Sequence, residues 1–465
     1  MMRLLAGLIL MASLSPAAAP AQSGLQARLD AAAPGDTIVV EGGVHPGPFV
    51  VDTSLVLMGQ NRPHLRGDDK THVVTVTAPD VTIEGFRITG SGKSLNQDHA
   101  GVMVKAARVT LRDNHLSDVL HGIYVMGKDR TVIANNRIEG PPTVTREVSA
   151  EEARRTSGCS VPVGGGPCTV PLPLAQRGNG IHLWNALHTT ITHNTVHHTR
   201  DGTYFSHSNH TYAAHNTIHN VRYGLHFMYS DGNTFEHNVF YDNASGSALM
   251  YSSNLTARYN VFRNNRTQRA YGLLLQSMTD GEIVDNRFTE NGTGVYLENS
   301  SRMTLRRNVV ASNYRGFRMT GSSMHNRFTE NIIRGNLNTA AVSGVSGTNE
   351  WQMDGRGNYW GARGLLDVNA DGVSELPHHT VDLLGGRRAS FPYVDLLAGS
   401  PGLALLAEAL GRVSGTGVPT LTDPAPLMKP PVALEGAGGW ALAPTLALGL
   451  ALLAVGWIAL RRQMA

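Results

Sequence analysis

The sequence predicts an all-β protein, a right-handed parallel β-helix with coils of about 22 residues. Two interleaved series of residues carry this prediction. Five of the eight gaps between successive asparagines are 22 residues, and seven glycines each precede the next asparagine by 14 residues. A fixed period of this length with strand-like content is typical of a stacked solenoid. The asparagines are Asn114, Asn136, Asn194, Asn216, Asn238, Asn260, Asn286, Asn308 and Asn331, and the glycines run from Gly122 to Gly316.

Apolar residues stand three positions before and two positions after each asparagine, as Leu111 and Leu116 do around Asn114. After each glycine the first and third residues are mostly apolar, as Ile123 and Val125 are. This alternation has the period of two that a short strand with one buried face requires. A helical solenoid would need apolar residues three and four apart and would not tolerate so much Gly, Asn and Thr. The asparagines are therefore predicted to be scaffold, each amide bonding the equivalent amide one coil away.

The first 21 residues are typical of a secretory signal peptide, because Arg3 precedes an apolar run that ends in small residues. The β-helix domain is predicted to span residues 22–398, beginning with a short capping helix around Leu25 to Ala33. Such a cap would cover the core and the unpaired strand edges at the open end of the first coil.

A second hydrophobic segment lies near the C-terminus. Residues 440–460 carry no charge and are long enough to cross a bilayer, and Arg461 and Arg462 follow at once. This arrangement predicts a transmembrane helix with residues 461–465 as a cytoplasmic tail. The solenoid would then lie in the periplasm, tethered to the inner membrane. Residues 399–439 are predicted to form a cap helix and then a linker rich in Pro, Gly and Thr.

The two cysteines, Cys159 and Cys168, lie in an insertion at about residues 140–176. In an exported protein they are predicted to form a disulfide, and a metal-binding or redox pair is the alternative. The formal net charge is +3 over 465 residues. A nearly neutral periplasmic chain offers no basic stripe for nucleic acid, so this class of partner is excluded.

Histidine and methionine gather on the outer face of the strands that begin at the glycines. The second and fourth positions of these strands point outward, which places His226, Met228 and Met250 together on neighbouring coils. His182 lies two coils from His226, and His207 lies at the intervening turn. Imidazole and thioether groups suit Cu(I) and are poor ligands for Mg, Ca or Mn. These five residues are the predicted site for Cu(I) as a transient cargo. A hydrophobic surface for another protein is a compatible alternative.

A second histidine column precedes the asparagines in three consecutive coils and consists of His193, His215 and His237. These residues are secondary candidates for metal binding. Stacking of the imidazoles along the coil axis is the simpler explanation.

The run Asp367-Val-Asn369-Ala-Asp371-Gly matches the opening of a calcium loop. His378 stands at the twelfth position, where an EF-hand has Glu, so a complete EF-hand is excluded. The three oxygen-bearing side chains remain a candidate calcium site, with a polar turn as the alternative.

Many parallel β-helices cut polysaccharides, so a lyase, hydrolase or epimerase acting on uronate polymers is the enzymatic alternative. Such chemistry uses carboxylates gathered on one outer face, and outward acids are sparse in this sequence. Asp201 and Asp231 stand in Asp-Gly pairs, which turn formation explains. No catalytic residue is therefore predicted, and a role other than an enzyme is favoured.

The chain resembles the NosD family, the periplasmic maturation factors of nitrous oxide reductase. The resemblance covers roughly residues 22–399 and rests on the coils, the stretch Arg222 to Ser230 and the motif Gly357-Asn-Tyr-Trp360. It implies an accessory protein docked on the ATPase and permease of an ABC transporter. It also implies a copper chaperone lipoprotein as donor and nitrous oxide reductase as recipient, with copper as cargo and sulfur as a second candidate. The C-terminal transmembrane segment departs from the family pattern.

Overall fold

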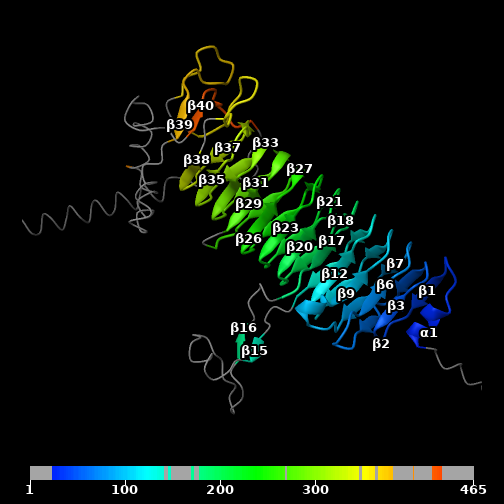
Figure 1. Cartoon of the computed structure of the whole chain (residues 1–465). Helices are drawn as coiled ribbons and strands as arrows, with labels where there is room; N and C mark the ends of the chain where they lie inside the picture. Colours follow the sequence, from blue (N-terminus) through cyan, green and yellow to red (C-terminus); the bar gives the residue numbers. More distant parts are fainter. Residues whose placement is uncertain are drawn as a thin grey trace, which may run out of the picture. The chain divides into compact units, whose positions relative to one another are not determined.

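The structure, a computed structural model, describes residues 24–140, 145–147, 169–171, 177–267, 270–344, 348–361, 365–380, 402 and 421–431. The chain folds into two compact units, residues 1–279 and residues 280–465. Both units consist mainly of short parallel strands stacked coil on coil (Figure 1). The predicted all-β class and parallel solenoid are therefore confirmed.

The described residues of the first unit form nine coils, and each coil gives one strand to each of three parallel sheets. Sheet A contains β1 (Thr37–Val40), β4 (Val56–Gly59), β7 (Thr82–Glu84), β10 (Thr110–Arg112), β13 (Val132–Ala134), β18 (Thr190–Thr192), β21 (Tyr212–Ala214), β24 (Thr234–Glu236) and β27 (Ser253–Arg258). Sheet B contains β2 (Val44–Pro46), β5 (His64–Arg66), β8 (Arg87–Thr89), β11 (His115–Ser117), β14 (Arg137–Glu139), β19 (Thr195–His197), β22 (Thr217–His219), β25 (Val239–Tyr241) and β28 (Val261–Arg263). Sheet C contains β3 (Phe49–Val51), β6 (Val74–Val76), β9 (Ala100–Val104), β12 (His121–Met126), β17 (Ile181–Trp184), β20 (Asp201–Ser206), β23 (Tyr223–Met228), β26 (Ser245–Met250) and β29 (Tyr271–Gln276).

The second unit repeats this three-sheet plan in three coils of its described residues. Its strands are β30 (Thr279–Val284), β33 (Ser301–Arg306) and β36 (Arg327–Thr329) in the first sheet; β31 (Arg287–Thr289), β34 (Val309–Ala311) and β37 (Ile332–Arg334) in the second; and β32 (Thr293–Glu298), β35 (Arg315–Gly321) and β38 (Asn338–Gly344) in the third. An antiparallel pair follows, β39 (His378–Thr380) with β40 (Leu421–Asp423).

A few elements lie outside the coils. Helix α1 (Leu25–Asp30) stands where the short N-terminal helix was predicted, and its Leu25 and Leu29 are buried. A 3-10 turn, η1 (Leu95–Gln97), precedes β9. Within the predicted insertion, β15 (Thr145–Glu147) pairs antiparallel with β16 (Thr169–Pro171).

Several predictions fall outside the described residues. These are the signal peptide, the disulfide between Cys159 and Cys168, almost all of the cap helix predicted within residues 399–439, and the transmembrane helix of residues 440–460. Within the described residues, the structure contains no helix that is both long and apolar enough to span a membrane.

The glycine series has a steric cause in sheet C. A Cβ placed on Gly224 would lie 2.6 Å from the ring of Phe240 and 2.7 Å from the carbonyl oxygen of Gly246 in the next coil. The strand of sheet C thus begins too close to its neighbours for any side chain at this position. Glycine is required here for close approach of two backbones.

The asparagine series forms a buried ladder that fixes the register of the coils. Asn216 shows the pattern: its Oδ1 accepts the backbone N–H and the side-chain amide of Asn194, at 2.9 Å and 3.0 Å. Its own amide donates to the carbonyl of Ile191 at 2.8 Å and to Oδ1 of Asn238 at 2.9 Å. Each side chain therefore joins three consecutive coils, and the predicted scaffold role is confirmed.

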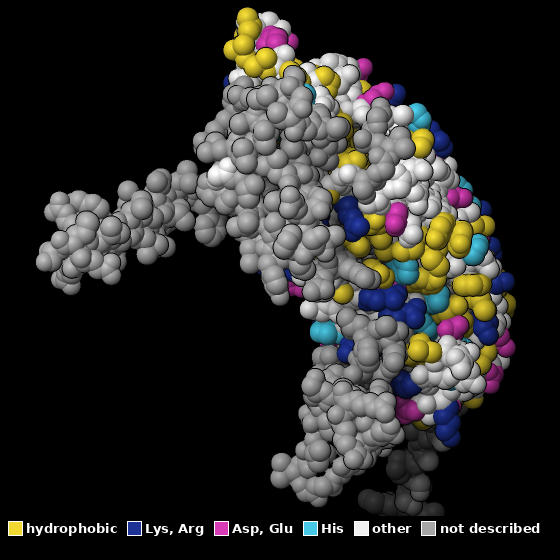
Figure 2. All heavy atoms as spheres, turned by 60° about the vertical axis from the view of Figure 1, so that its left-hand side comes forward, with side chains coloured by type: hydrophobic (Ala, Val, Ile, Leu, Met, Phe, Trp, Pro, Cys, Tyr) yellow, Lys and Arg dark blue, Asp and Glu magenta, His cyan; other side chains and the backbone are white. Residues whose placement is uncertain are grey.

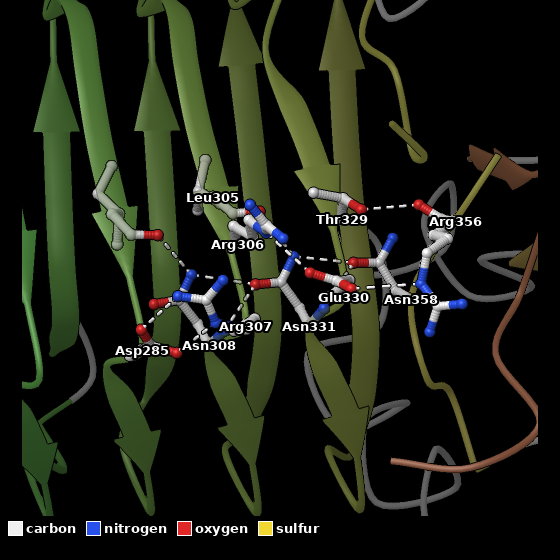
Figure 3. A network of polar contacts seen from close by, with 11 residues as sticks. Asp285, Leu305, Arg306, Arg307, Asn308, Thr329, Glu330, Asn331, Arg356 and Asn358 are labelled. Atoms are coloured by element: carbon white, nitrogen blue, oxygen red, sulfur yellow. Dashed lines mark hydrogen bonds and ion pairs between the residues drawn. The ribbon is translucent and has the colours of Figure 1, made fainter. Parts of the chain in front are cut away.

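In the second unit the same ladder passes through Asn308, Asn331 and Asn358 (Figure 3) and ends on a carboxylate. Asp423 accepts the backbone N–H of Asn358 and the indole N–H of Trp360, both at 2.7 Å. Burial raises the pKa of Asp423, and these donors oppose the rise. Asp423 belongs to the stretch predicted as a linker, so residues 421–431 of that stretch are folded onto the second unit.

Replacing Asn216 by Ala should lower the free energy of unfolding by roughly 3 kcal/mol, because the buried donors of Asn194 would lose their acceptor. Thermal unfolding followed by circular dichroism measures the effect as a fall of several degrees in the midpoint. The control is Asn96→Ala, at an exposed position in η1, which should change stability by less than about 0.5 kcal/mol. Equal midpoints for both variants would show that the ladder does not hold the coils.

Candidate functional site

The predicted His/Met face lies on the outer side of sheet C, and its register is the one that the 22-residue period predicts. One column, here the histidine column, consists of Tyr124, His182, Tyr204 and His226, which are Cα partners in successive strands. A second column two residues further along, the methionine column, consists of Met126, Trp184, Ser206, Met228 and Met250. Figure 2 shows hydrophobic, histidine and basic side chains gathered together on one face.

The two columns differ in exposure, which the sequence did not predict. His182 and His226 are 7% and 9% exposed, so the histidine column lies on the outer side of sheet C but is not the exposed surface that was expected. Met126 and Trp184 are 43% and 39% exposed, and Met228 is half-buried. An ion or a partner would therefore meet the methionine column first.

Ring contacts join the members of the histidine column, and those of Tyr204 with the two histidines are edge-to-face. The ring centroids of His182 and Tyr204 are 4.8 Å apart, and those of Tyr204 and His226 are 4.9 Å apart. Tyr204 thus stands between the two histidines. His182 and His226 are two coils apart, as predicted, and their imidazoles do not converge on one point.

A buried ion pair between Asp201 and Arg222 contacts the ring of His226. Asp201 is fully buried, and its carboxylate accepts two hydrogen bonds from Arg222, at 2.8 Å and 2.7 Å. Nδ1 of His226 lies 3.0 Å from Oδ2 of the same carboxylate. Burial alone would raise the pKa of Asp201, but the hydrogen bonds from His226 and Arg222 outweigh it and lower the pKa. Asp201 is therefore an ionised, structural acceptor within β20. The turn role predicted for it is wrong.

The ionised carboxylate determines which nitrogen of His226 is available. A carboxylate can only accept, so Nδ1 of His226 must carry the proton. A neutral imidazole has one donor and one acceptor, which leaves a lone pair on Nε2. The side chain of His226 keeps 11% exposure.

The other predicted ligands are placed as follows. His207 lies at the turn after β20, where its backbone N–H donates to the carbonyl of Met228 at 3.2 Å. Its ring stacks on Tyr229 with centroids 5.1 Å apart. Met228 and Met250 are Cα partners in neighbouring strands. Met228 and Met250 thus lie next to His226 on one face, and His207 lies beside Met228 and Tyr229. His182 is separated from His226 by Tyr204.

The second histidine column has a geometry that explains its presence without metal. The rings of His193, His215 and His237 are nearly parallel, with successive centroids 4.9 Å apart. The lone pair of an imidazole nitrogen lies in the plane of the ring, so the lone pairs of nearly parallel, stacked rings do not point at a common ion. The stacking interpretation accounts for the observed geometry.

The sequence did not single out His121, which lies beside the histidine column. This residue is 1% exposed, and its Nδ1 accepts the backbone N–H of Asn179 at 3.0 Å. Its Nε2 lies 3.4 Å from a carboxylate oxygen of Asp98. The imidazole therefore accepts a backbone N–H of the neighbouring coil, as the asparagine Oδ1 atoms do in the ladder. His121 precedes Gly122, and the same position in the next coils holds Asn179 and Asp201.

Within the part of the chain that the structure describes, no group of three or more His, Cys, Asp or Glu side chains is arranged to hold a metal ion. In the candidate calcium loop, Asp367 accepts the backbone N–H groups of Asp371 and Gly372, at 3.2 Å and 3.0 Å. Asn369 accepts that of Asp371 at 3.0 Å. A polar turn explains these contacts, and calcium binding stays a prediction.

These features define a parallel β-solenoid protein with an imidazole and thioether face on one sheet. A family model described as "Periplasmic copper-binding protein (NosD)" matches residues 155–364. A "Probable ABC transporter binding protein NosD" from Pseudomonas aeruginosa is 32% identical over 407 residues, covering 84% of this chain and 88% of the relative. Its counterpart from Stutzerimonas stutzeri is 30% identical and covers 84% of this chain and 86% of the relative. The chain therefore belongs to the NosD family.

Among solved structures, the A-module of mannuronan C-5 epimerase AlgE6 from Azotobacter vinelandii has a TM-score of 0.56. The two chains are 13% identical, and the match covers 72% of this chain and 93% of the module. At this identity the likeness shows a common fold.

The buried histidines predict that the protein loses stability in acid. Burial lowers the pKa of His182 to about 3 and the pKa values of His72 and His197 to about 4, from the ordinary value of 6.5. Between these values the unfolded chain binds more protons than the folded one. The stabilising contribution is therefore complete above about pH 6.5 and declines as the pH falls toward 4 and 3.

Thermal midpoints measured from pH 7 to pH 4 should fall for the full-length chain. They should fall less steeply for His182→Phe, which keeps an aromatic ring in the column but cannot titrate. Identical pH dependence in both proteins would contradict the assignment of a neutral, buried His182.

Proposed function

We propose that this chain is a periplasmic, non-enzymatic accessory protein of an ABC transporter that carries Cu(I) for assembly of the copper centres of nitrous oxide reductase. The family description names periplasmic copper binding, and the relatives are named as transporter binding proteins. The partners would be the transporter ATPase and permease, a copper chaperone lipoprotein as donor, and the reductase as recipient. Sulfur is a second candidate cargo. The proposed tether to the inner membrane is the segment of residues 440–460.

The observation that carries the proposal is the register of sheet C. It places His226 two residues before Met228 on one face and makes Met228 the Cα partner of Met250. Neighbouring strands are about 4.8 Å apart and a two-residue step is about 6.8 Å, so flexible thioether side chains can reach an ion held at His226. One imidazole and two thioethers form a soft ligand set that prefers Cu(I) to hard cations.

The partial exposure of the set suits transfer. Met228 and Met250 are half-buried beside the exposed Trp184 and Met126, so an incoming protein could offer its own ligands from the methionine side. Cu(I) would then pass by stepwise ligand exchange, with a thioether leaving as a ligand of the recipient binds.

The double variant His226→Ala with Met228→Ala should lower the Cu(I) affinity of the full-length protein by at least about 10-fold. Competition with a chromophoric Cu(I) chelator measures the affinity, and circular dichroism checks that the coils remain folded. His325→Ala with Met324→Ala is the matched control, because it removes the same residue types from a turn of the second unit. Unchanged affinity in the first variant would remove this site assignment. Shortened or unsaturated products from a uronate polymer would instead support a carbohydrate-active enzyme.

A further inference from the structure

Asn179 and Asp201 occupy the same place in consecutive coils. Each stands directly before the glycine at the start of its coil's sheet C segment, Gly180 or Gly202. Each also meets an arginine that lies one coil further on: Nε of Arg200 donates to Oδ1 of Asn179 at 3.1 Å, and Arg222 donates twice to Asp201. The two pairs are thus equivalent in position but differ in charge, because one acceptor is an amide and the other a carboxylate.

Each member of this position also contacts a histidine of the histidine column. Asp201 contacts Nδ1 of His226, which lies one coil further on, at 3.0 Å, whereas the amide nitrogen of Asn179 lies 3.4 Å from Nδ1 of His182 in its own coil. The orientation of the Asn179 amide follows from chemistry. Arginine can only donate, so the oxygen of the amide must face Arg200 and its NH₂ group must face His182.

The two histidines therefore hold their protons on opposite nitrogens. His226 donates from Nδ1 to a carboxylate, so in its neutral form the lone pair is on Nε2. His182 accepts at Nδ1 from an amide, so its proton is on Nε2. Nε2 of His182 is buried and has no hydrogen-bond partner among the residues that the structure describes. Burial lowers the pKa of His182 to about 3, which keeps this imidazole neutral near pH 7.

Only one of these arrangements prepares a histidine to bind a metal ion. Metal-binding imidazoles generally donate their second ring N–H to a carboxylate or carbonyl, which orients the ring and makes the ligating nitrogen more basic. The Asp201–His226 pair has this arrangement. To ligate through Nε2, His182 would have to place its proton on Nδ1, directly against an amide that Arg200 holds as a donor.

We propose that Asp201 with Arg222, and Asn179 with Arg200, are positioning residues that select His226 as the ion-binding histidine of the column and withhold His182. This inference rests on the proposed copper function and adds a rule to it. The residue before the glycine, a carboxylate or an amide, decides which nitrogen is free on the histidine that it contacts, and so decides which histidine holds the ion. The position of the ion would thus be set by one charge, since both sets contain an arginine and a histidine and differ only in having a carboxylate or an amide.

The substitution Asp201→Asn tests the rule, because the new amide would meet Arg222 as Asn179 meets Arg200. The new amide should turn its oxygen to Arg222 and its NH₂ to His226, which moves the proton of His226 from Nδ1 to Nε2. Cu(I) affinity should fall about 10- to 100-fold, the usual effect of losing an orienting partner. Two-bond 15N–1H correlation spectra of the metal-free, full-length protein labelled with 15N-histidine report the tautomer.

The reverse substitution, Asn179→Asp, keeps the test decisive if Asp201→Asn does not fold. The spectra should then show His182 changing to the Nδ1–H form, with its signal assigned by loss in His182→Phe. Asp280→Asn is the matched control, because Asp280 accepts two hydrogen bonds of 2.7 Å from Arg302, with no histidine in the pair. The control should leave both tautomers and the Cu(I) affinity unchanged.

The outcomes separate this inference from the proposed function. Tautomers that stay the same in both variants would overturn the inference, whether or not the protein binds copper. A changed His226 tautomer with unchanged Cu(I) affinity would overturn the selection role. A wild-type protein that shows the two opposite tautomers but does not bind Cu(I) would overturn the proposed function and leave the positioning of the protons established.

Discussion

The buried asparagine ladder is the interaction on which the remaining structure depends. A short strand of three residues cannot define its own register, and a slip of one residue would exchange its buried and outward faces. A buried amide that is bonded on both sides penalises any slip, because each lost partner leaves an unsatisfied polar group in the interior. Asn194, Asn216 and Asn238 impose this penalty at the same place in consecutive coils. Residues 22 apart in the chain therefore become neighbours.

The same register organises the chemistry of sheet C. It lays a carboxylate, an arginine and an imidazole from two coils against one another, as Asp201, Arg222 and His226 show. A buried carboxylate without partners would be costly. Here Arg222 and His226 of the next coil supply the partners, because the repeat places them beside Asp201. The repeat thus permits a buried carboxylate beneath the outer face of sheet C. The charge of this carboxylate determines which nitrogen of the His226 imidazole carries the proton. The thioethers of the methionine column lie on the more exposed side of this face.

The sequence predicted the coils, the two faces of sheet C and the neighbourhood of His226, Met228 and Met250, because all of these follow from period and alternation. It did not predict the burial of His226, which depends on neighbouring coils and not on alternation within a strand. Asp201 was assigned to a turn, since an Asp-Gly pair is a turn signal, whereas its real partners lie one coil away. Asp423 was missed because it lies within a stretch rich in Pro, Gly and Thr and belongs to the ladder only through packing.

X-ray absorption spectroscopy at the copper edge of the Cu(I)-loaded, full-length protein tests the account most directly, because it identifies the ligand atoms without reference to any variant. The proposed site should give a first coordination shell of one imidazole nitrogen and two thioether sulfurs, contributed by His226, Met228 and Met250. A first shell without sulfur, or one composed of several imidazoles, would contradict the claim that the coil register brings these three side chains together as a copper site.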